Sequence, residues 1–300
     1  MISLVLTLRP REKCGLPPAL GRAAHSALLR AIAEHDPALA ERLHADNGAR
    51  PFTCSSLIGK RGNGAVSPEL PYTLRYTALT QDIDFGFWTG GSQIAGSPIA
   101  DRGSEIENPR SAIGDPKSET RDPRNPPSTI ELDGVRFDVT AATCDPAQQS
   151  WAARASFEEL SARWLLAREM PASRIGLQFA SPTAFKQAGK AQLFPLPDLV
   201  FGSLLEKWNA FAPVALPDET RRFAAECLAV SRFDLETHAA PFKDAGALKS
   251  GAVGKVTFVA LNHDRYWLSI INLLADFALF AGVGVSTALG MGQARRIADL

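Results

Sequence analysis

Three side chains near the amino terminus have the chemistry for moving protons beside a phosphate. His44 is followed six residues later by Arg50, and His25 lies upstream of both. Histidine titrates near neutral pH and can act as an acid or a base, whereas arginine keeps its charge and can bind two phosphate oxygens. These groups suit a reaction in which a 2′-hydroxyl of RNA attacks the neighbouring phosphate without a metal ion. A single histidine is more often structural than catalytic, so the residue types alone leave both interpretations open.

A second feature is a glycine-rich segment near the carboxyl terminus. Residues 282–296 read Gly-Val-Gly-Val-Ser-Thr-Ala-Leu-Gly-Met-Gly-Gln-Ala-Arg-Arg, so two Gly-x-Gly pairs flank five residues and a basic pair follows. Glycine allows positive φ angles and close approach to the main chain, whose N–H groups can hold phosphates. The segment is not a dinucleotide fingerprint, because Thr287 occupies a required glycine position and a helix precedes it. It predicts either a phosphate contact or a tight helix-to-strand turn.

Short basic clusters elsewhere are also suited to contacts with phosphates. One cluster lies in a loop between two predicted strands, one flanks a loop in the second half, and one follows the glycine-rich segment. A solvated charged face is an equally good interpretation of any one cluster. The residues predicted to contact RNA are Gly282, Gly284, Ser286, Thr287, Gly290, Gly292, Arg295, Arg296, Lys186, Lys190, Lys60 and Arg61.

The composition limits the class of protein. Lys plus Arg and Asp plus Glu both number 32, so the net charge is zero and contact with a polyanion must come from local clusters. The four cysteines stand far apart, which predicts reduced thiols and a cytoplasmic location. We find no signal peptide, no membrane-spanning run and no ligand spacing typical of a metal site. The sequence therefore predicts no metal, no other cofactor and no membrane contact.

Strands and helices alternate along the chain, which indicates an α+β fold. The elements predicted in the first half are strands at 2–8, 52–58 and 72–79, a strand or hairpin at 129–140 around Asp133-Gly134, and helices at 19–33 and from Asp36-Pro37 to His44. The elements predicted after residue 150 are helices beginning at Ser156 and after Asp218, helices at 199–211 and 267–280, and strands at 174–179, 232–237 and 253–261. Ser156 with Glu159 has the pattern of a capping box.

We predict two domains, residues 1–170 and 171–300, with a boundary near Met170-Pro171. Residues 80–128 form an irregular insertion in the first domain. Within it, the stretch 90–127 is rich in Gly, Pro, Ser and charge and has no sustained apolar period, which predicts a loop or disorder.

The chain resembles the CRISPR-associated endoribonucleases that cut precursor CRISPR RNA, members of the RAMP superfamily. The glycine-rich segment is similar to their carboxyl-terminal signature. The amino-terminal match covers residues 36–44 (Asp-Pro-Ala-Leu-Ala-Glu-Arg-Leu-His), Gly48 and 50–55 (Arg-Pro-Phe-Thr-Cys-Ser), and the middle match covers 180–186, 207–209 and 251–256. The resemblance implies two tandem ferredoxin-like, RRM-like domains. The first domain departs from it, because a second helix after Leu79 is poorly supported.

The resemblance also implies roles for the amino-terminal residues. His44 matches the family's general acid–base histidine, and Arg50 stands where a cationic lysine is frequent, which keeps the charge but excludes a proton-transfer role. Some members have a tyrosine in the first helix where this chain has Leu29, and others use a histidine from that helix, for which His25 is the candidate. The implied activity is metal-independent cleavage of CRISPR repeat RNA that leaves a 2′,3′-cyclic phosphate or 3′-phosphate and a 5′-hydroxyl.

Two other functions are compatible with the same residues. One is a non-catalytic RAMP-type subunit that holds guide RNA in a CRISPR effector complex, and the other is a generic RNA-recognition module. His44 with Arg50 favours the enzyme over the first, and the three-part resemblance argues against the second. The expected partner is CRISPR repeat RNA, as precursor and as retained product. Association with effector-complex subunits and a homodimer are left open.

Overall fold

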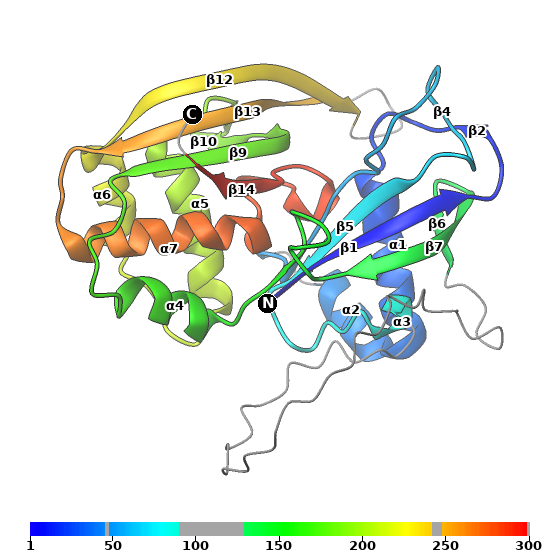
Figure 1. Cartoon of the computed structure of the whole chain (residues 1–300), viewed down its shortest axis with the longest axis horizontal. Helices are drawn as coiled ribbons and strands as arrows, with labels where there is room; N and C mark the ends of the chain where they lie inside the picture. Colours follow the sequence, from blue (N-terminus) through cyan, green and yellow to red (C-terminus); the bar gives the residue numbers. More distant parts are fainter. Residues whose placement is uncertain (46–47, 90–128, 242–247, 299–300) are drawn as a thin grey trace, which may run out of the picture.

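The chain folds into two halves, each built on an antiparallel sheet (Figure 1). The structure is a computed structural model and describes residues 1–45, 48–89, 129–241 and 248–298. The elements of the first half are β1 (Ile2–Pro10), β2 (Cys14–Gly15), α1 (Gly21–His35), α2 (Pro37–Ala45), β3 (Phe52–Cys54), β4 (Ala65–Val66), β5 (Tyr72–Ala78), α3 (Gly86–Thr89), β6 (Thr129–Leu132), β7 (Val135–Thr143) and β8 (Ala153–Arg154). The elements of the second half are α4 (Phe157–Leu165), β9 (Arg174–Thr183), β10 (Phe185–Gln187), β11 (Lys190–Gln192), α5 (Pro197–Phe211), α6 (Glu219–Cys227), β12 (Leu228–Pro241), β13 (Leu248–Ala260), α7 (Arg265–Ala281), η1 (Thr287–Leu289) and β14 (Ala294–Ile297).

Both main sheets have the strand order of a β-α-β-β-α-β unit. The first half runs β3-β5-β1-β7, with β6 at the edge, and the second runs β12-β13-β9-β14. In each, the first strand of the unit lies between the third and the fourth, and neighbouring strands are antiparallel. This is the ferredoxin-like arrangement. The prediction of an α+β fold with two tandem ferredoxin-like units is therefore confirmed.

The core of the first half lies between α1 and one face of the sheet. Leu28 and Ile32 of α1 pack in the same buried cluster as Leu4 and Leu6 of β1, as the helical period of residues 19–33 predicted. Where the unit would have its second helix, the described residues hold only the single turn α3. Its Trp88 stacks on Tyr76 with ring centroids 4.7 Å apart, so aromatic packing covers this part of the sheet. The predicted loop at 90–127 lies outside the described residues.

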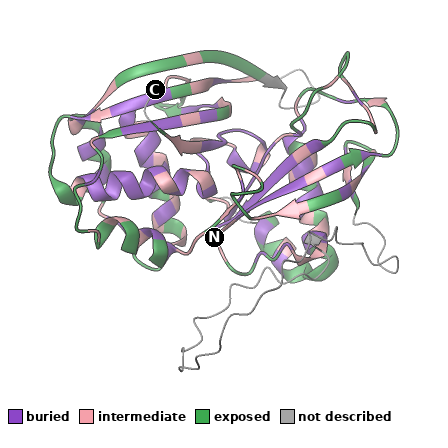
Figure 2. Ribbon diagram, in the orientation of Figure 1, coloured by how far each residue is buried: buried purple, intermediate pink, exposed green. Residues whose placement is uncertain are grey.

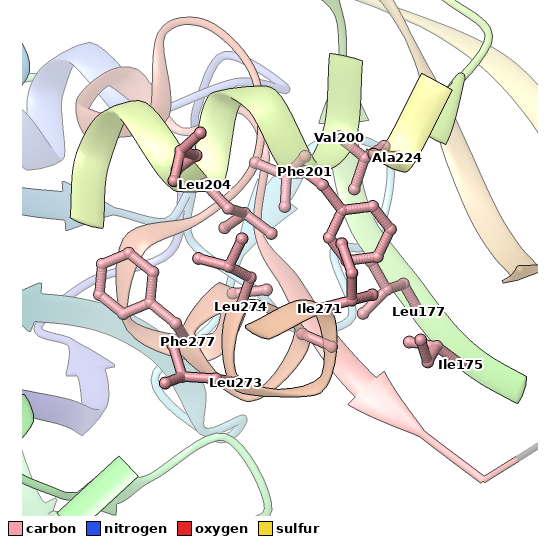
Figure 3. Close-up of a cluster of buried hydrophobic side chains, with 14 of the residues drawn as sticks. Ile175, Leu177, Val200, Phe201, Leu204, Ala224, Ile271, Leu273, Leu274 and Phe277 are labelled. Carbon is pink, nitrogen blue, oxygen red and sulfur yellow. The ribbon is translucent and has the colours of Figure 1, made fainter. Parts of the chain in front are cut away.

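The core of the second half surrounds α7, which is buried along most of its length (Figures 2 and 3). Ile271 and Leu274 of α7 face Phe201 of α5 and Leu177 of β9 in this cluster. Asp264 begins the helix, because its carboxylate accepts hydrogen bonds from the N–H groups of two residues in the first turn. No helix in the described ranges is long and apolar enough to cross a bilayer.

Helix α4 belongs to the second core, although it precedes the boundary predicted at Met170-Pro171. The predicted capping box between Ser156 and Glu159 is present. The ring of Phe157, however, lies 5.0 Å from that of Trp208, inside the second core. The spacing of apolar residues predicted the helix, but it did not predict which of the two sheets the helix packs against. The cores divide before α4, so this helix packs with the second half of the chain.

Candidate active site

His25 lies on α1 at the junction of the two halves. Its Nδ1 is 3.1 Å from the carbonyl oxygen of Ala288 in the glycine-rich segment, and its ring centroid is 5.4 Å from that of the buried Phe52. A carbonyl oxygen only accepts, so Nδ1 carries the proton of the neutral ring and Nε2 is left as an acceptor. Burial lowers the pKa of His25 below its ordinary value of 6.5, the hydrogen bond to the Ala288 carbonyl opposes this shift, and the charges of Arg50 and His44 add to it. The neutral imidazole is therefore the favoured form at pH 7.

The charges of His44 and Arg50 both act on the pKa of His25. His25 lies on α1, His44 in the last turn of α2, and Arg50 in the segment before β3. His44 is exposed, whereas Arg50 is half-buried and donates a hydrogen bond to the carbonyl oxygen of Leu43 at the end of α2. This hydrogen bond holds the Arg50 side chain against the last turn of α2, which contains His44. Leu29, at the family's tyrosine position, packs against the first core.

All four glycines of the glycine-rich segment adopt positive φ angles, 62° at Gly282, 76° at Gly284, 93° at Gly290 and 67° at Gly292. They are also needed for close backbone packing. A Cβ on Gly284 would overlap the carbonyl oxygen of Ala184, and one on Gly290 would lie 2.9 Å from the Cα of Gly21. The segment is therefore a tight helix-to-strand turn that packs against both halves.

Burial divides the residues of this segment that were predicted to contact RNA. Gly282, Thr287, Gly290 and Gly292 are buried inside the protein, where their role is internal packing. Gly284 and Ser286 are half-exposed, and the hydroxyl of Ser286 accepts a hydrogen bond of 2.9 Å from Lys249 Nζ.

Arg295 and Arg296 on β14 have different partners. Arg295 donates to Gln178 Oε1 at 2.9 Å and to Ser150, and its guanidinium lies 4.5 Å from the ring centroid of Trp151. Arg296 forms an ion pair of 3.4 Å with Asp276. The charge of Arg296 is therefore largely neutralised within the protein, whereas Arg295 is bound only to neutral groups.

The remaining predicted basic residues are placed separately on the surface. Lys186 and Lys190 are exposed on the β10–β11 hairpin, and Lys60 is exposed in the loop after β3. Arg61 beside it donates to the carbonyl oxygens of Pro17 and Leu57, so it holds two segments of the first half together. These residues do not join the histidine site.

Two cations at the junction were not predicted as functional residues. Arg75 of β5 is 3% exposed and donates to Ser3 Oγ and to the side chain of Gln293, while burial lowers its pKa to about 9. Arg75 and Ser181 help to line a cleft of about 970 Å³ between the halves. Lys207 of α5 contacts the glycine-rich segment. The sequence signal for Arg75 is a charged residue inside a buried strand, whereas Lys207 also lies within residues 207–209 of the family resemblance.

The described ranges contain no group of three or more His, Cys, Asp or Glu side chains placed to hold a metal ion. His238, which also lines the cleft, pairs with Glu236 at 3.2 Å.

Comparisons with known proteins agree with this architecture. Over residues 177–294 the chain matches the family model of the CRISPR-associated endoribonuclease Cas6. The second half of the chain is therefore similar to the Cas6 family, and the relatives and solved structures described below support the same family.

The curated relatives match part of the chain. A CRISPR-associated endoribonuclease Cas6 of Mycobacterium tuberculosis is 35% identical over 121 residues, which are 40% of this chain and 37% of that protein. The Cas6 endoribonuclease of Streptococcus thermophilus is 28% identical over 116 residues, which are 38% of this chain and 46% of that protein. The matched part thus spans less than half the length of these relatives.

Solved structures match the fold over the whole chain. A Cas6 product complex has a TM-score of 0.73 at 21% identity and covers 99% of both chains. Thermus thermophilus Cas6 has a TM-score of 0.64 at 21% identity and covers 99% of this chain and 98% of its own. A RAMP protein that binds different RNA substrates has a TM-score of 0.56 at 14% identity, covering 99% of this chain and 100% of its own.

Proposed function

We propose that this protein is an endoribonuclease that cuts precursor CRISPR RNA within the repeats. The observation that carries the proposal is that Arg50 and His44 act electrostatically on His25, which contacts the Ala288 carbonyl of the second half. The family supports it, since the curated relatives are endoribonucleases. The similar Cas6 structures include a product complex and a substrate-mimic complex, which supports repeat RNA as the partner.

The three side chains suit a metal-independent mechanism. Nε2 of His25 takes the proton of the 2′-hydroxyl, and the 2′-oxygen then attacks the adjacent phosphorus. The bond from phosphorus to the 5′-oxygen breaks, and that oxygen takes a proton from His44. Arg50 faces the negative charge that grows on the phosphate oxygens. The products are a 2′,3′-cyclic phosphate, which water can open to a 3′-phosphate, and a 5′-hydroxyl.

The assignment of roles follows from the surroundings of each histidine. Burial favours the neutral form of His25, and the Ala288 carbonyl fixes its proton on Nδ1, so it is suited to accept a proton. His44 is exposed, so solvent reaches the group that is proposed to donate the proton. Arg50 keeps its charge through the reaction.

The test is cleavage of repeat RNA from the host's own array in EDTA, followed by analysis of the product ends. We expect cleavage to persist and His44→Ala to slow it by about 10²-fold or more, with little change in RNA affinity. His263→Ala, which removes an exposed histidine from the second half, is the matched control.

Three results would change the proposal. Loss of cleavage in EDTA that returns with a divalent ion would refute the metal-independent mechanism. A near wild-type rate in His44→Ala would refute His44 as the acid and leave the acid–base role to His25 alone. Tight binding of the repeat without any cleavage would favour the non-catalytic RAMP-type subunit.

A further inference from the structure

Lys207 is half-buried and places its ammonium group against the glycine-rich segment. Its Nζ donates to the carbonyl oxygens of Ala281 and Gly282 at 3.0 Å each and lies 3.3 Å from Thr287 Oγ1. The two carbonyls belong to the end of α7, where a helix leaves carbonyl oxygens without partners in the helix. All three acceptors are neutral oxygens. Burial accordingly lowers the pKa of Lys207 to about 7, although nearby Glu206 opposes this shift.

The two ends of the glycine-rich segment that Lys207 contacts are hydrogen-bonded to each other. The N–H of Val283 donates to the carbonyl oxygen of Gly292 at 2.8 Å, and a Cβ on Gly282 would lie 2.9 Å from that same oxygen. Such close backbone contacts leave little room for internal rearrangement. A displacement at Thr287 is therefore transmitted to the neighbouring residue, Ala288.

Ala288 connects this segment to the first half. Its side chain packs in the first core, although the residue follows α7 in the chain, and its carbonyl oxygen receives His25 Nδ1 at 3.1 Å. A continuous set of contacts thus runs from Lys207 through Thr287 and Ala288 to His25.

We propose that Lys207 is a positioning residue for His25. Its ammonium group holds the glycine-rich segment so that the Ala288 carbonyl keeps the imidazole proton on Nδ1 and leaves Nε2 free to accept a proton. The effect on His25 is a property of the folded protein alone. The consequence for cleavage rests on the proposed function, in which Nε2 is the base.

A lysine suits this place better than an apolar side chain of the same length. An apolar side chain would fill the space but leave the carbonyls of Ala281 and Gly282 without their donor, and unsatisfied buried acceptors favour movement toward water. Arginine has a planar fork that does not fit three acceptors around one nitrogen. Lys207→Met therefore removes the donors with the smallest change in shape.

The experiment measures the tautomer and pKa of His25 by ¹⁵N NMR, with the His25→Gln spectrum used to assign the signal among the five histidines. In the wild type we expect the Nδ1–H tautomer and a pKa below 6.5. In Lys207→Met we expect a mixture of tautomers and a still lower pKa, because the hydrogen bond to the Ala288 carbonyl, which raises the pKa of His25, is weakened. Lys13→Met, which removes an exposed lysine, should change neither.

Thr287 supplies a second pair of variants in case Lys207→Met does not fold. Thr287→Val removes the hydroxyl that faces Lys207 but keeps the branched shape, and Thr287→Ser keeps the hydroxyl. The proposal expects Thr287→Val to move the His25 signals in the same direction as Lys207→Met, and Thr287→Ser to leave them near the wild type. Unchanged tautomer and pKa in folded Lys207→Met, or in Thr287→Val when the former does not fold, would overturn it.

Repeat cleavage provides a separate readout. Misplacing the base should lower kcat by on the order of 10- to 10²-fold, with the affinity for repeat RNA nearly unchanged. If the wild-type protein does not cleave RNA, the proposed function fails while the NMR result still decides the role of Lys207. If Lys207→Met shifts the His25 signals but cleaves at the wild-type rate, the positioning of His25 stands and its role as the base is refuted.

Discussion

The contact between Gly21 and Gly290 should be one of the least tolerant points of the junction. Gly21 begins α1, and a Cβ there would overlap the carbonyl oxygen of Leu289 and lie 2.6 Å from the Cα of Gly290. These are backbone atoms, so no side-chain rotation can relieve the overlap. In Gly21→Ala either α1 or the glycine-rich segment must move.

The size of the effect can be estimated from two opposing contributions. Overpacking in a close-packed region costs about 1–3 kcal/mol. Alanine in a helix is favoured over glycine by about 1 kcal/mol, and less in the first turn. The net loss of unfolding free energy in Gly21→Ala is therefore about 1–2 kcal/mol. For a chain of this size, that loss corresponds to a decrease in Tm of about 2–8 °C.

The assay is thermal unfolding of Gly21→Ala beside Gly15→Ala, followed by repeat cleavage. Gly15 has no atom within 4 Å of an added Cβ, so its replacement tests the change in backbone entropy alone and should alter stability by about 0.5 kcal/mol or less. Because the displaced segment carries Ala288, Gly21→Ala should also slow cleavage below the melting transition. Equal Tm values and equal cleavage rates for the two variants would refute the idea that the Gly21–Gly290 contact positions the two halves relative to each other.

Two further predictions concern titration and charge. The pKa of His25 lies below 6.5 in the folded protein, so as pH falls the unfolded chain protonates this histidine before the folded protein does. The free energy of unfolding should therefore decrease as pH falls below about 6.5. The low-pH limb of kcat should likewise have an apparent pKa below 6.5, and it should disappear in His25→Gln; a limb above 7 would exclude His25 as the base. Arg295→Ala should weaken RNA binding and reduce the salt slope by about 0.7 for a single-stranded contact, whereas Arg296→Ala should leave binding unchanged and lower Tm by removing the ion pair with Asp276. Equal effects of the two arginine variants on RNA binding would mean that neither lies on the RNA path or that both do.

Local patterns in the sequence predicted most of the fold. The helix at 19–33, the hairpin around Asp133-Gly134 and the capping box at Ser156 depend on neighbours within a few residues, and all three are present. The order of the strands followed from the resemblance. The predicted boundary at Met170-Pro171 did not anticipate that α4 packs in the second core, because the apolar face of α4 does not encode which of two sheets it covers.

The candidate site was less predictable, because contacts between residues far apart in the sequence leave no local pattern. His44 and Arg50 are close in the sequence, and their spacing drew attention to them. The contact of His25 with Ala288 joins positions 263 residues apart, and the partner is a backbone carbonyl, which any residue type supplies. The partner of Arg296 was equally hidden, because Asp276 lies on a helix that the sequence predicts only as apolar.

The zero net charge of the chain does not mean that its charges are evenly compensated. Arg296 is paired with a carboxylate, as exposed arginines elsewhere on the surface are. Arg75, Arg295 and Lys207 instead bind neutral oxygens, and all three lie where the two halves meet. Coulomb repulsion from Arg295 even lowers the pKa of Arg75. These three cations therefore place positive charge, bound to neutral groups, beside the junction that also holds His25. A polyanion drawn to that charge would arrive beside the histidines, so a neutral protein can still direct RNA to its candidate active site.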